Sequence, residues 1–316
     1  MQNLLRPLTF DNFIGQERLK ETLKVILDSA LKRKKQPDHI LFHGPAGLGK
    51  TSLANILGSK IKGKTKYIQG PLLEKKADVL SMFASITNGD VIFIDEIHGV
   101  NKTVEELLYS AMEDGVLDVL IGPDGDQKIM RMKLPKFTLI GATTKFSKLS
   151  QPLKDRFGFI GKLLKYADDE IKQIITNSAE ALKIRIDDES LKIISSHSRQ
   201  TPRIANNLLK RCLDFAIAKG EKIIKKIVVY DAFDNIGLYK YGLTDHHINY
   251  LNLLANSFKN KWASIDSIIG ILNDDKQNIE REIEPILIYN GLIEKGSRGR
   301  RITIKGVNYS NSYNLK

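Results

Sequence analysis

The stretch that decides the fold is "HILFHGPAGLGKTS", residues 39–52, in which an apolar run meets three glycines, a lysine and two hydroxyl side chains. Residues 44–51 fit the pattern G-x-x-x-x-G-K-[ST], and the flanking runs predict a strand before the loop and a helix after it. Backbone N–H groups of such a turn, with the positive end of the following helix, surround a phosphate. We expect Lys50 to reach the β- and γ-phosphates of a nucleotide and Thr51 to bind Mg²⁺; an ordinary glycine-rich turn is the alternative.

The surrounding sequence predicts the architecture that carries this loop. From residue 39 to about 160, short apolar runs such as "VIFIDE" and "FTLIGATT" alternate with helical stretches. This alternation is typical of a parallel sheet with helices on both faces, because strands buried on both faces have continuous apolar runs. We therefore predict an α/β P-loop ATPase domain with a parallel sheet over residues 1–166.

Two further domains are predicted after the sheet. Residues 167–238 have a purely helical pattern, which indicates a small all-helical lid domain. The chain then has three helix-like segments, at 244–258, 264–272 and 277–290, followed by the basic hairpin sequence "GLIEKGSRGRRITIK". Three helices closed by a hairpin make a winged helix. We predict a winged-helix DNA-binding domain over residues 239–316.

Charge and cysteine content narrow the partners and the compartment. Lysine and arginine exceed aspartate and glutamate by 49 − 37 = 12, which favours a polyanionic partner such as nucleic acid. A merely basic, soluble proteome is the alternative, and the charge alone does not decide between the two. The single cysteine, Cys212, lies in an apolar helical pattern and is expected to be a packed core thiol. No apolar run approaches the roughly 18 residues of a membrane span, and the N-terminus lacks the apolar segment of a secretory signal. We expect a cytosolic protein with no membrane partner.

Polar residues at the ends of two predicted strands add the chemistry of hydrolysis. The apolar strand of "VIFIDEIH", residues 91–98, ends in Asp95 and Glu96. Asp95 can hold Mg²⁺ through water, and Glu96 can polarise an attacking water. The strand end at Thr143 and Thr144 is expected beside them, where a hydroxyl can orient that water or contact the γ-phosphate. Each alone could be a strand cap, but together they describe an ATPase.

Hydrolysis of a phosphoanhydride also needs a cation near the developing charge, usually an arginine. Two arginines are candidates, Arg156 in "PLKDRF" and Arg203 in "TPRIAN". Arg203 follows a predicted helix start in the lid domain, so a lid could use it to sense nucleotide across a cleft. For an isolated arginine, a solvated or ion-paired role is the alternative.

Eight segments of the sequence occur in the order of one known family: "LRPLTFDNFIGQE", "GPAGLGKTSLANI", "FIDEIH", "EELLYSAMEDG", "IGATT", "PLKDRF", "TPRIANNLLKR" and "IEPILIYNGLIEKGSRGR". From about Leu4 to Thr303 the chain resembles the RuvB family, the AAA+ motors of bacterial Holliday-junction branch migration. The resemblance implies an ATP-dependent DNA motor in homologous recombination and DNA repair. It also implies a homohexameric ring that acts with RuvA, and with the RuvC resolvase where that is present.

The resemblance implies roles for single residues at the nucleotide. It implies that the phosphates are bound by Gly47, Lys50, Thr51 and Ser52, and the metal by Thr51 and Asp95. It also implies that the adenine side is contacted by Leu5 and Arg6. Further nucleotide contacts are implied for Glu113, Asp114, Gly115 and, at the hinge, Tyr166. Thr144 is implied as the first sensor and Arg203 as the second, while Arg156 resembles the finger supplied to the ATP of the neighbouring subunit.

The sequence departs from the family pattern locally. Gly99 and Lys145 stand where the family usually has arginine, and Gly115 stands where it has an aromatic residue. The segment "GLYKYGLTDHHINYL" that follows the lid domain is also less regular than in the family. These departures leave the chemistry of ATP intact and concern the contacts at residues 113–115 and the linker.

The predicted winged helix favours DNA binding without base reading. Its candidate recognition helix, "KQNIEREIEPILIYNG", carries Glu280, Glu282 and Glu284, which suits a polyanion poorly. The adjoining wing, "EKGSRGRR", offers basic side chains on a glycine-rich turn, suited to phosphate contacts: Lys295, Arg298, Arg300 and Arg301. The resemblance supports Lys295 and Arg300 as DNA contacts on double-stranded DNA and the Holliday junction. A solubilising basic hairpin is the alternative.

A second hairpin is predicted at residues 118–137, where the turn residues "GPDGD" separate two semi-apolar arms. In the family this element docks onto RuvA. Its apolar residues are more hydrophobic surface than a free hairpin needs, which is typical of a partner site: Val119, Leu120, Ile121, Ile129 and Met130. A mere extension of the sheet edge is the alternative.

Three other functions share parts of this pattern. A clamp-loader-like ATPase shares the ATP chemistry, but the terminal winged helix argues against it. An ATP-switched DNA-binding regulator is disfavoured because Glu96 indicates turnover and the acidic helix is unsuited to reading an operator. A small-molecule P-loop kinase would leave Arg156 and the basic wing without a role.

Overall fold

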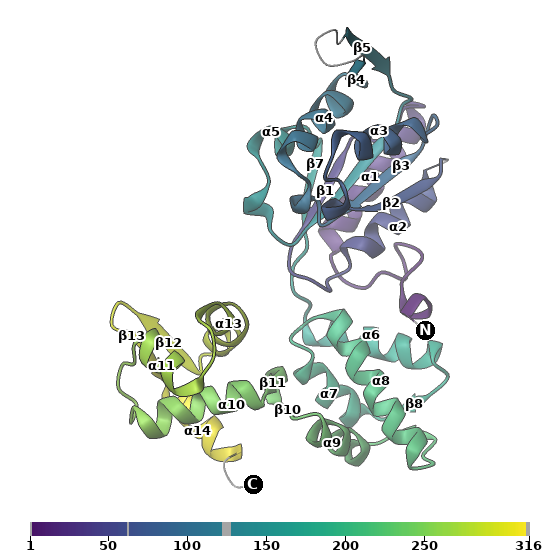
Figure 1. Ribbon diagram of the computed structural model, residues 1–316. Coiled ribbons are helices and arrows are strands. Elements are labelled where there is room, and N and C mark those ends of the chain that lie inside the picture. Colours follow the sequence, from purple (N-terminus) through teal and green to yellow (C-terminus); the bar gives the residue numbers. More distant parts are fainter. Residues whose placement is uncertain (1, 62, 122–127, 314–316) are drawn as a thin grey trace. The chain divides into compact units, whose positions relative to one another are not determined.

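The computed structural model describes residues 2–61, 63–121 and 128–313 (Figure 1). The chain divides into two compact units. The phosphate-loop unit contains residues up to Ile174 together with Thr201–Arg203, and the second unit contains Ile175–Gln200 and the chain from Ile204 onward.

A five-stranded parallel sheet forms the centre of the phosphate-loop unit, in the order β2-β3-β6-β1-β7. The strands are β1 (Ile40–His43), β2 (Thr65–Gln69), β3 (Val91–Asp95), β6 (Thr138–Thr143) and β7 (Phe159–Lys162). The predicted parallel sheet is confirmed. Because β1 and β3 both pair with β6 in parallel, the phosphate loop after β1 and the carboxylates after β3 lie at the same edge of the sheet.

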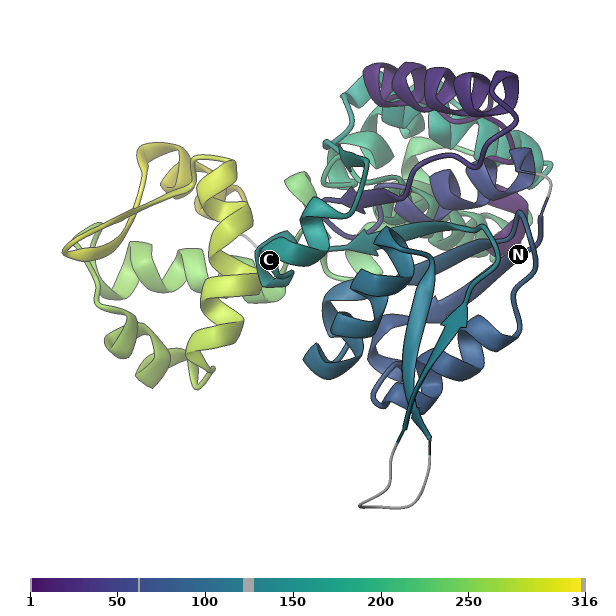
Figure 2. The same cartoon turned by 90° about the horizontal axis from the view of Figure 1, so that it is seen from above.

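Helices cover both faces of this sheet, and Figure 2 shows purple α1 on one side and the blue helices α3 and α4 on the other. Side chains of alternate strand residues point to opposite faces, so Leu41, Ile92 and Ile94 pack toward α3 and α4 in one hydrophobic cluster. Burying each such side chain contributes about 1.5–3 kcal/mol. The helices are α1 (Glu17–Lys32), α2 (Lys50–Lys60), α3 (Lys76–Ala84), α4 (Lys102–Glu113) and α5 (Gln151–Asp155).

An antiparallel hairpin, β4 (Val116–Ile121) and β5 (Lys128–Lys133), follows α4 and confirms the predicted hairpin. It begins two residues before the predicted start, because Val116 already pairs with Lys133. Asp118 lies opposite Arg131 and the two side chains form an ion pair of 2.8 Å. The predicted turn residues Gly122–Asp126 lie outside the described residues.

Four helices follow the sheet: α6 (Asp168–Ala181), α7 (Asp188–His197), α8 (Pro202–Ala218) and α9 (Lys226–Asn235). The Asp187 side chain caps α7 by accepting from the Ser190 N–H, which satisfies a donor that the helix leaves unpaired. The domain also holds a two-residue parallel ladder, β8 (Arg185–Ile186) with β9 (Ile223–Ile224), that the helical pattern did not predict. Cys212 is fully buried, as predicted.

The C-terminal part confirms the predicted winged helix. Its regular elements are α10 (Asp245–Asn252), α11 (Ile265–Leu272), α12 (Lys276–Asn278), α13 (Glu284–Tyr289), β12 (Ile293–Gly296), β13 (Gly299–Ile302) and α14 (Ile304–Tyr313). The π-helical turn Ile279–Ile283 joins α12 to α13, and Pro285, which has no N–H to donate, follows it. The last helix, α14, was not predicted.

The remaining elements are short. A π-helical turn, Leu253–Ser257, extends α10, and β10 (Leu238–Tyr239) pairs with β11 (Leu243–Thr244). Within the described part of the chain, 3₁₀ turns lie at Gln2–Leu5, Gly70–Leu72, Ile97–Gly99, Phe146–Lys148 and Lys240–Gly242. Among the described residues, no helix has the length and apolar character needed to cross a membrane.

Candidate nucleotide-binding site

The phosphate loop connects β1 to α2 and depends on glycine at Gly47 and Gly49. Both have positive φ, 79° and 105°, a conformation that other residues adopt at a cost. A Cβ at Gly47 would lie 2.8 Å from Thr201 Cγ2, and one at Gly49 would lie 2.8 Å from the Phe13 ring. Neighbouring side chains therefore leave no space for a side chain at Gly47 or Gly49, and the backbone N–H groups line the loop.

Lys50 begins α2 and is 6% exposed. Its Nζ donates to the Gly44 carbonyl at 2.8 Å and to the Pro45 carbonyl at 2.9 Å. Burial lowers the pKa of Lys50, while the nearby charges of Glu96 and Asp95 act in the opposite direction. The side chain therefore lies along the loop, with its ammonium group bonded to neutral carbonyls.

Thr51 and Asp95 bring two oxygen donors together, because α2 starts beside the end of β3. The Thr51 hydroxyl lies 3.4 Å from Asp95 Oδ2. Hydroxyl and carboxylate oxygens are ligands that Mg²⁺ accepts, and Mg²⁺ usually takes its other ligands from water and substrate phosphates. Thr51 and Asp95 could therefore supply two of the oxygen ligands of such an ion.

Glu96 is held in a defined orientation by two neighbours. Its Oε2 accepts from the Thr144 hydroxyl at 2.9 Å and lies 3.0 Å from His98 Nδ1. Glu96 has φ 49°, a left-handed conformation that is costly for a non-glycine residue and persists where function or packing requires it. The predicted meeting of the two strand ends is confirmed.

His98 was not predicted as part of the site, although it stands in the same "DEIH" segment. Its Nδ1 also lies 2.9 Å from the Thr143 hydroxyl. Burial lowers the pKa of His98, and Lys145 and Lys148 lower it further, while Glu96 raises it. The imidazole is therefore neutral near pH 7 and links the ends of β3 and β6.

Tyr166 and Arg203 both reach the phosphate loop. The buried Tyr166 hydroxyl donates to the Leu48 carbonyl at 3.0 Å, and burial raises the Tyr166 pKa. The Arg203 N–H donates to the Gly47 carbonyl at 3.4 Å. Both residues therefore contact the loop, and their roles as hinge and second sensor toward a nucleotide stay predictions.

Arg156 lies against α4. Its guanidinium pairs with Glu113 at 2.7 Å, stacks 4.8 Å above the Tyr109 ring and donates to the Pro152 carbonyl. Its Nε is buried and has no hydrogen-bond partner among the described residues. Sequence reasoning did not connect Arg156 with Glu113, because 43 residues separate the two in the chain.

The other residues predicted to contact the nucleotide lie at the ends of helices or turns or in a first helical turn. Asp114 and Gly115 follow the end of α4, and a Cβ at Gly115 would meet nothing within 4 Å, so its φ of 66° and not lack of space favours glycine. Leu5 is partly buried and ends a 3₁₀ turn, and Arg6 is exposed. Ser52 lies in the first turn of α2 and is partly buried.

The wing differs from its prediction at Arg300, which was expected on an exposed, flexible turn. Arg300 is 6% exposed, and its Nε donates to Glu284 at 2.5 Å and its Nη2 to Glu280 at 2.8 Å. The predicted exposure was wrong because residues alternate along β13, so Arg300 and Ile302 point inward. Lys295 is half exposed and pairs with the same two glutamates.

The outward side of the wing carries Arg298 and Arg301, packed on Trp262. The Arg298 and Arg301 guanidinium groups lie 5.4 and 4.9 Å from the Trp262 ring centre. The ring covers Gly296, where a Cβ would lie 3.1 Å from it. Arg301 Nη2 also donates to Glu294 at 2.8 Å, whereas Arg298 is exposed and its cation–π contact leaves its N–H edge available to solvent. Trp262 was missed because it lies 36 residues before Arg298 in the sequence.

Comparison with known proteins decides the family. Family models match residues 5–163 (Holliday junction DNA helicase RuvB P-loop domain), 166–238 (RuvB AAA lid domain) and 240–311 (RuvB C-terminal winged helix domain). This chain belongs to the RuvB family. Within the RuvB family it is an AAA+ ATPase, and it binds nucleotide through the P-loop domain.

RuvB relatives cover nearly the whole chain. The Holliday junction branch migration complex subunit RuvB of Mesomycoplasma hyopneumoniae strain 7448 is 54% identical over 305 residues, 96% of each chain. The subunit of the same name from Fusobacterium nucleatum is 42% identical over 316 residues, which are 100% of this chain and 95% of the relative. The solved Thermotoga maritima RuvB branch migration motor aligns with a TM-score of 0.81 and 34% identity, covering 99% of this chain and 100% of that one.

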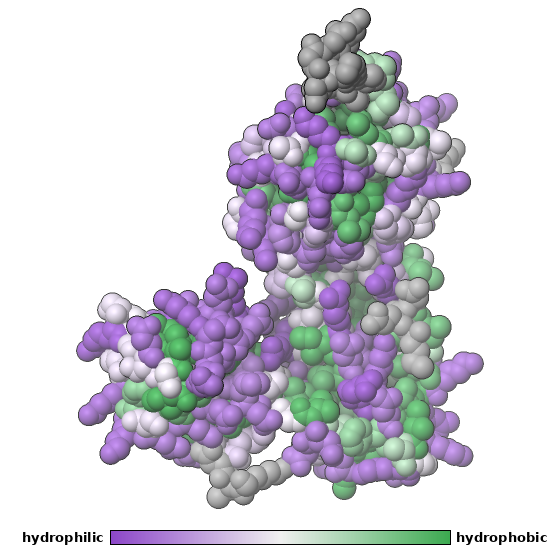
Figure 3. Space-filling view, in the orientation of Figure 1, coloured by the Kyte–Doolittle hydropathy of each residue, from purple (hydrophilic) through white to green (hydrophobic). Residues whose placement is uncertain are grey.

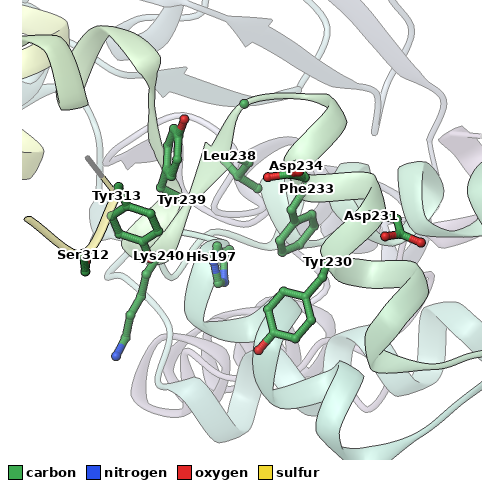
Figure 4. A pocket seen from close by; sticks show the side chains of 11 residues that line it. His197, Tyr230, Asp231, Phe233, Asp234, Leu238, Tyr239, Lys240, Ser312 and Tyr313 are labelled. Carbon is green, nitrogen blue, oxygen red and sulfur yellow. The ribbon is translucent and has the colours of Figure 1, made fainter. Parts of the chain in front are cut away.

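A separate cavity of about 390 Å³ lies in the second unit, between the end of α9, the 3₁₀ turn at Lys240 and the last turn of α14 (Figure 4). Five of its eleven lining residues are aromatic, and the rings of Tyr239 and Tyr313 pack edge to face with their centres 4.9 Å apart. The predicted RuvB site residues are not among its lining residues.

Proposed function

We propose that this chain is the ATP-driven subunit that moves DNA through a Holliday junction, in homologous recombination and DNA repair. One observation carries the proposal: a single chain joins two pairs of groups suited to hydrolysis, Thr51 with Asp95 and Glu96 with Thr144, to a winged helix with an arginine-rich wing. The relatives' names supply the DNA substrate, since both curated relatives are subunits of a branch migration complex.

The proposed chemistry follows from the positions of the side chains. Lys50 leaves its two loop carbonyls to contact the β- and γ-phosphates, and the loop N–H groups from Gly47 onward bind the β-phosphate with Ser52. Thr51 and Asp95 would hold Mg²⁺, which would supply charge neutralisation at the phosphates. Leu5 and Arg6 contact the adenine side, in keeping with the family pattern.

Glu96 orients the attacking water in this proposal. A carboxylate polarises water best when its geometry is fixed in advance, and the Thr144 hydroxyl holds one oxygen of Glu96 at 2.9 Å. Because His98 is neutral, it adds a hydrogen bond at this carboxylate without adding a charge. Thr144 therefore acts both as the first sensor and as the support of the base.

Arg156 serves the ATP of a neighbouring subunit, which requires a ring of copies, proposed as a hexamer. Its stacked guanidinium and its unsatisfied buried Nε are consistent with a donor that waits for a partner from another molecule. Glu113, Asp114 and Gly115 would then lie beside that shared site. Exposed apolar side chains of the lid offer surface for such contacts, namely those of Ile217, Ile227 and Ile236. Figure 3 shows hydrophobic (green) surface over the lid.

The wing grips duplex DNA through phosphates. Arg298 is exposed on Trp262, and Lys295 is half exposed beside it on the hairpin. Contacts of this kind do not depend on base sequence, which a moving motor needs. A direct contact by Arg300 stays a prediction and requires its guanidinium to leave Glu284.

The β4–β5 hairpin is proposed as the docking site for RuvA. Ile129 is 72% exposed and Met130 50% exposed, so two neighbouring apolar side chains of β5 offer surface to a partner. The side chains of Val119, Leu120 and Ile121 lie outside the described residues.

RuvC is proposed as a further partner from the family pattern. The domain bounds are proposed as residues 1–166, 167–238 and 239–316.

A branch-migration assay tests the proposed function. The purified chain is mixed with a synthetic four-way junction, ATP and Mg²⁺, with and without RuvA, and strand products are followed over time. We expect ATP-dependent migration that RuvA stimulates. Failure to migrate together with strong sequence-specific duplex binding would favour the ATP-switched regulator.

Two variants separate the proposed roles. Arg156→Ala should bind ATP normally and fail to hydrolyse it, so normal hydrolysis would exclude the finger assignment.

Ile129→Asp, combined with Leu120→Asp, should abolish RuvA-dependent stimulation and leave basal ATP hydrolysis unchanged, because the changes lie on the hairpin. Unaltered stimulation would exclude this docking site.

A further inference from the structure

The segment Arg199–Arg203, called here the coupling segment, belongs to both compact units. The chain passes from the second unit to the phosphate-loop unit between Gln200 and Thr201, and returns between Arg203 and Ile204. Five residues thus connect contacts that are made separately inside each unit. Four peptide units between the Cα atoms of Arg199 and Arg203 span at most about 14 Å.

The end of the coupling segment in the phosphate-loop unit contacts Gly47. The Arg203 N–H donates to the Gly47 carbonyl, and Arg203 Cβ lies 2.9 Å from where a Gly47 Cβ would be. Thr201 Cγ2 lies 2.8 Å from the same point. A shift of the loop around a phosphate is therefore felt directly by Thr201 and Arg203.

The other end of the coupling segment holds the winged-helix domain. The Arg199 guanidinium donates twice to the Gly242 carbonyl, from Nε at 2.9 Å and from Nη2 at 2.6 Å. Gly242 lies in the linker that leads into α10. The Gln200 side-chain oxygen accepts from the Tyr289 hydroxyl at 2.8 Å, and Tyr289 is the last residue of α13.

The backbone between the two ends is strained. Arg199 has φ 53° and Gln200 has φ 58°, so two consecutive non-glycine residues are left-handed. This conformation is costly for residues with a Cβ and persists only where surrounding contacts impose it. The strain favours release of the segment whenever contacts at either end weaken.

The cavity in Figure 4 lies beside this anchoring point. Its walls include His197, two residues before Arg199, and Tyr239 and Lys240, just before Gly242. Packing that leaves about 390 Å³ free gives fewer van der Waals contacts than a closed interior. The hydrogen bonds of Arg199 and Gln200 therefore supply a larger share of what positions the winged-helix domain on the lid.

We propose that the coupling segment transmits the state of the phosphate loop to the winged-helix domain, with Arg199, Gln200 and Tyr289 as positioning residues. This inference rests on the proposed function and adds the residues through which hydrolysis is converted into movement of the wing. Arg199 fixes the linker, and Gln200 fixes the end of α13. Both lie within two residues of Thr201, which contacts the loop.

The first test compares Tyr289→Phe with Tyr230→Phe, which removes a hydroxyl from another exposed tyrosine. ATP binding, ATP hydrolysis and branch migration are measured on the full chain with RuvA and a four-way junction. We expect Tyr289→Phe to keep ATP binding and hydrolysis, while the ATP consumed per base pair migrated rises about 2- to 10-fold, as expected for loss of one hydrogen bond. Arg199→Lys, which keeps the charge and loses the double contact, should act in the same direction.

A second measurement does not depend on migration. Labels are attached at Glu21→Cys and Ser297→Cys, both exposed, and the distance between them is measured with ADP and with a non-hydrolysable ATP analogue. The buried Cys212 thiol, whose pKa burial raises to about 12, should not react. We expect a nucleotide-dependent change of distance that Tyr289→Phe weakens and Tyr230→Phe preserves.

The outcomes separate the two proposals. If the chain fails to migrate junctions but shows the distance change and its loss in Tyr289→Phe, the coupling segment stands and the proposed function fails. If it migrates junctions and Tyr289→Phe matches Tyr230→Phe in both measurements, the coupling segment is overturned. If Tyr289→Phe lowers both ATP binding and the melting temperature, Tyr289 has a merely structural role, and the coupling segment is also overturned.

Discussion

Lys50 in the phosphate loop and Arg300 in the wing are buried to the same extent, each 6% exposed, yet their charged groups have different partners. Lys50 Nζ bonds to two neutral carbonyls, whereas the Arg300 guanidinium bonds to the carboxylates of Glu284 and Glu280. Burial lowers the pKa of Lys50. At Arg300 burial also acts to lower the pKa, but the bonds and charge of Glu284 outweigh it and raise the pKa.

This comparison shows that the partner of a buried cation, and not its burial, decides its role. A buried ammonium whose hydrogen bonds go to neutral carbonyls can exchange those carbonyls for an anionic ligand, although the charges of Glu96 and Asp95 lie near it. A buried cation paired with two carboxylates is already compensated and acts as structure. The phosphate loop therefore keeps its charge for a ligand, while the wing uses Arg300 to join β13 to α13.

The largest effect on activity should come from Lys50→Ala, which removes the cation kept for the ligand. Loss of charge-assisted bonds to two phosphates lowers nucleotide affinity by about 100-fold or more, and hydrolysis should be lost with it. Equilibrium binding of a fluorescent nucleotide measures this, with Lys60→Ala at the exposed end of α2 as the matched control. Retained binding in Lys50→Ala would contradict the assignment of the loop.

Removal of a charge in the wing should lower the free energy of unfolding and leave nucleotide binding unchanged. Glu284→Gln leaves Arg300 buried and partly unpaired, which costs about 3–5 kcal/mol of folding free energy for a broken buried pair. Urea unfolding followed by Trp262 fluorescence measures it, because Trp262 is the single tryptophan and packs on the wing. Glu282→Gln, at an exposed position, is the control, and equal stability of the two variants would sink the structural role.

A smaller effect concerns His247, which caps α10 by accepting from the Thr244 N–H at 3.1 Å. Burial, with a further contribution from Arg199, lowers the pKa of His247 to about 4. Since the unfolded chain binds this proton near pH 6.5, stability is present above that pH and falls as the pH drops toward 4. The loss amounts to about 2 kcal/mol between pH 7 and pH 5.

His247→Gln should remove this pH dependence while keeping an acceptor for the cap. Urea unfolding at pH 7 and at pH 5 measures the difference, and His246→Gln at the neighbouring exposed position is the control. A pH dependence that is the same in both variants would show that other groups cause it.

The smallest effect should come from Arg298→Ala, which removes an exposed cation of the wing without breaking a buried pair. Affinity for duplex DNA should fall several-fold at moderate salt, and the slope of log affinity against log salt should fall by about one. Fluorescence titration over a range of salt concentrations measures both. Arg211→Ala on the lid should leave the slope unchanged, and an unchanged slope in Arg298→Ala would remove Arg298 from the DNA contacts.

Much of the fold followed from local patterns. The G-x-x-x-x-G-K-T loop, the apolar runs of β3 and β6 and the change to helical periodicity after the sheet are each encoded by neighbouring residues. The meeting of Glu96 and Thr144 was also predictable, because the carboxyl ends of parallel strands share one edge. The last helix, α14, was missed because the expected winged helix already ended at its hairpin.

The sequence by itself determined the chemical groups, their order and the family to which they belong. Only the tertiary structure decided which of the basic residues keep a free charge, since that depends on carboxylates distant in sequence: Arg300 meets Glu284, Arg156 meets Glu113, and Lys50 meets neutral carbonyls. The physical reason is that a charge in a poorly hydrated site interacts mainly with its nearest partners, and the fold, not the local sequence, chooses those partners.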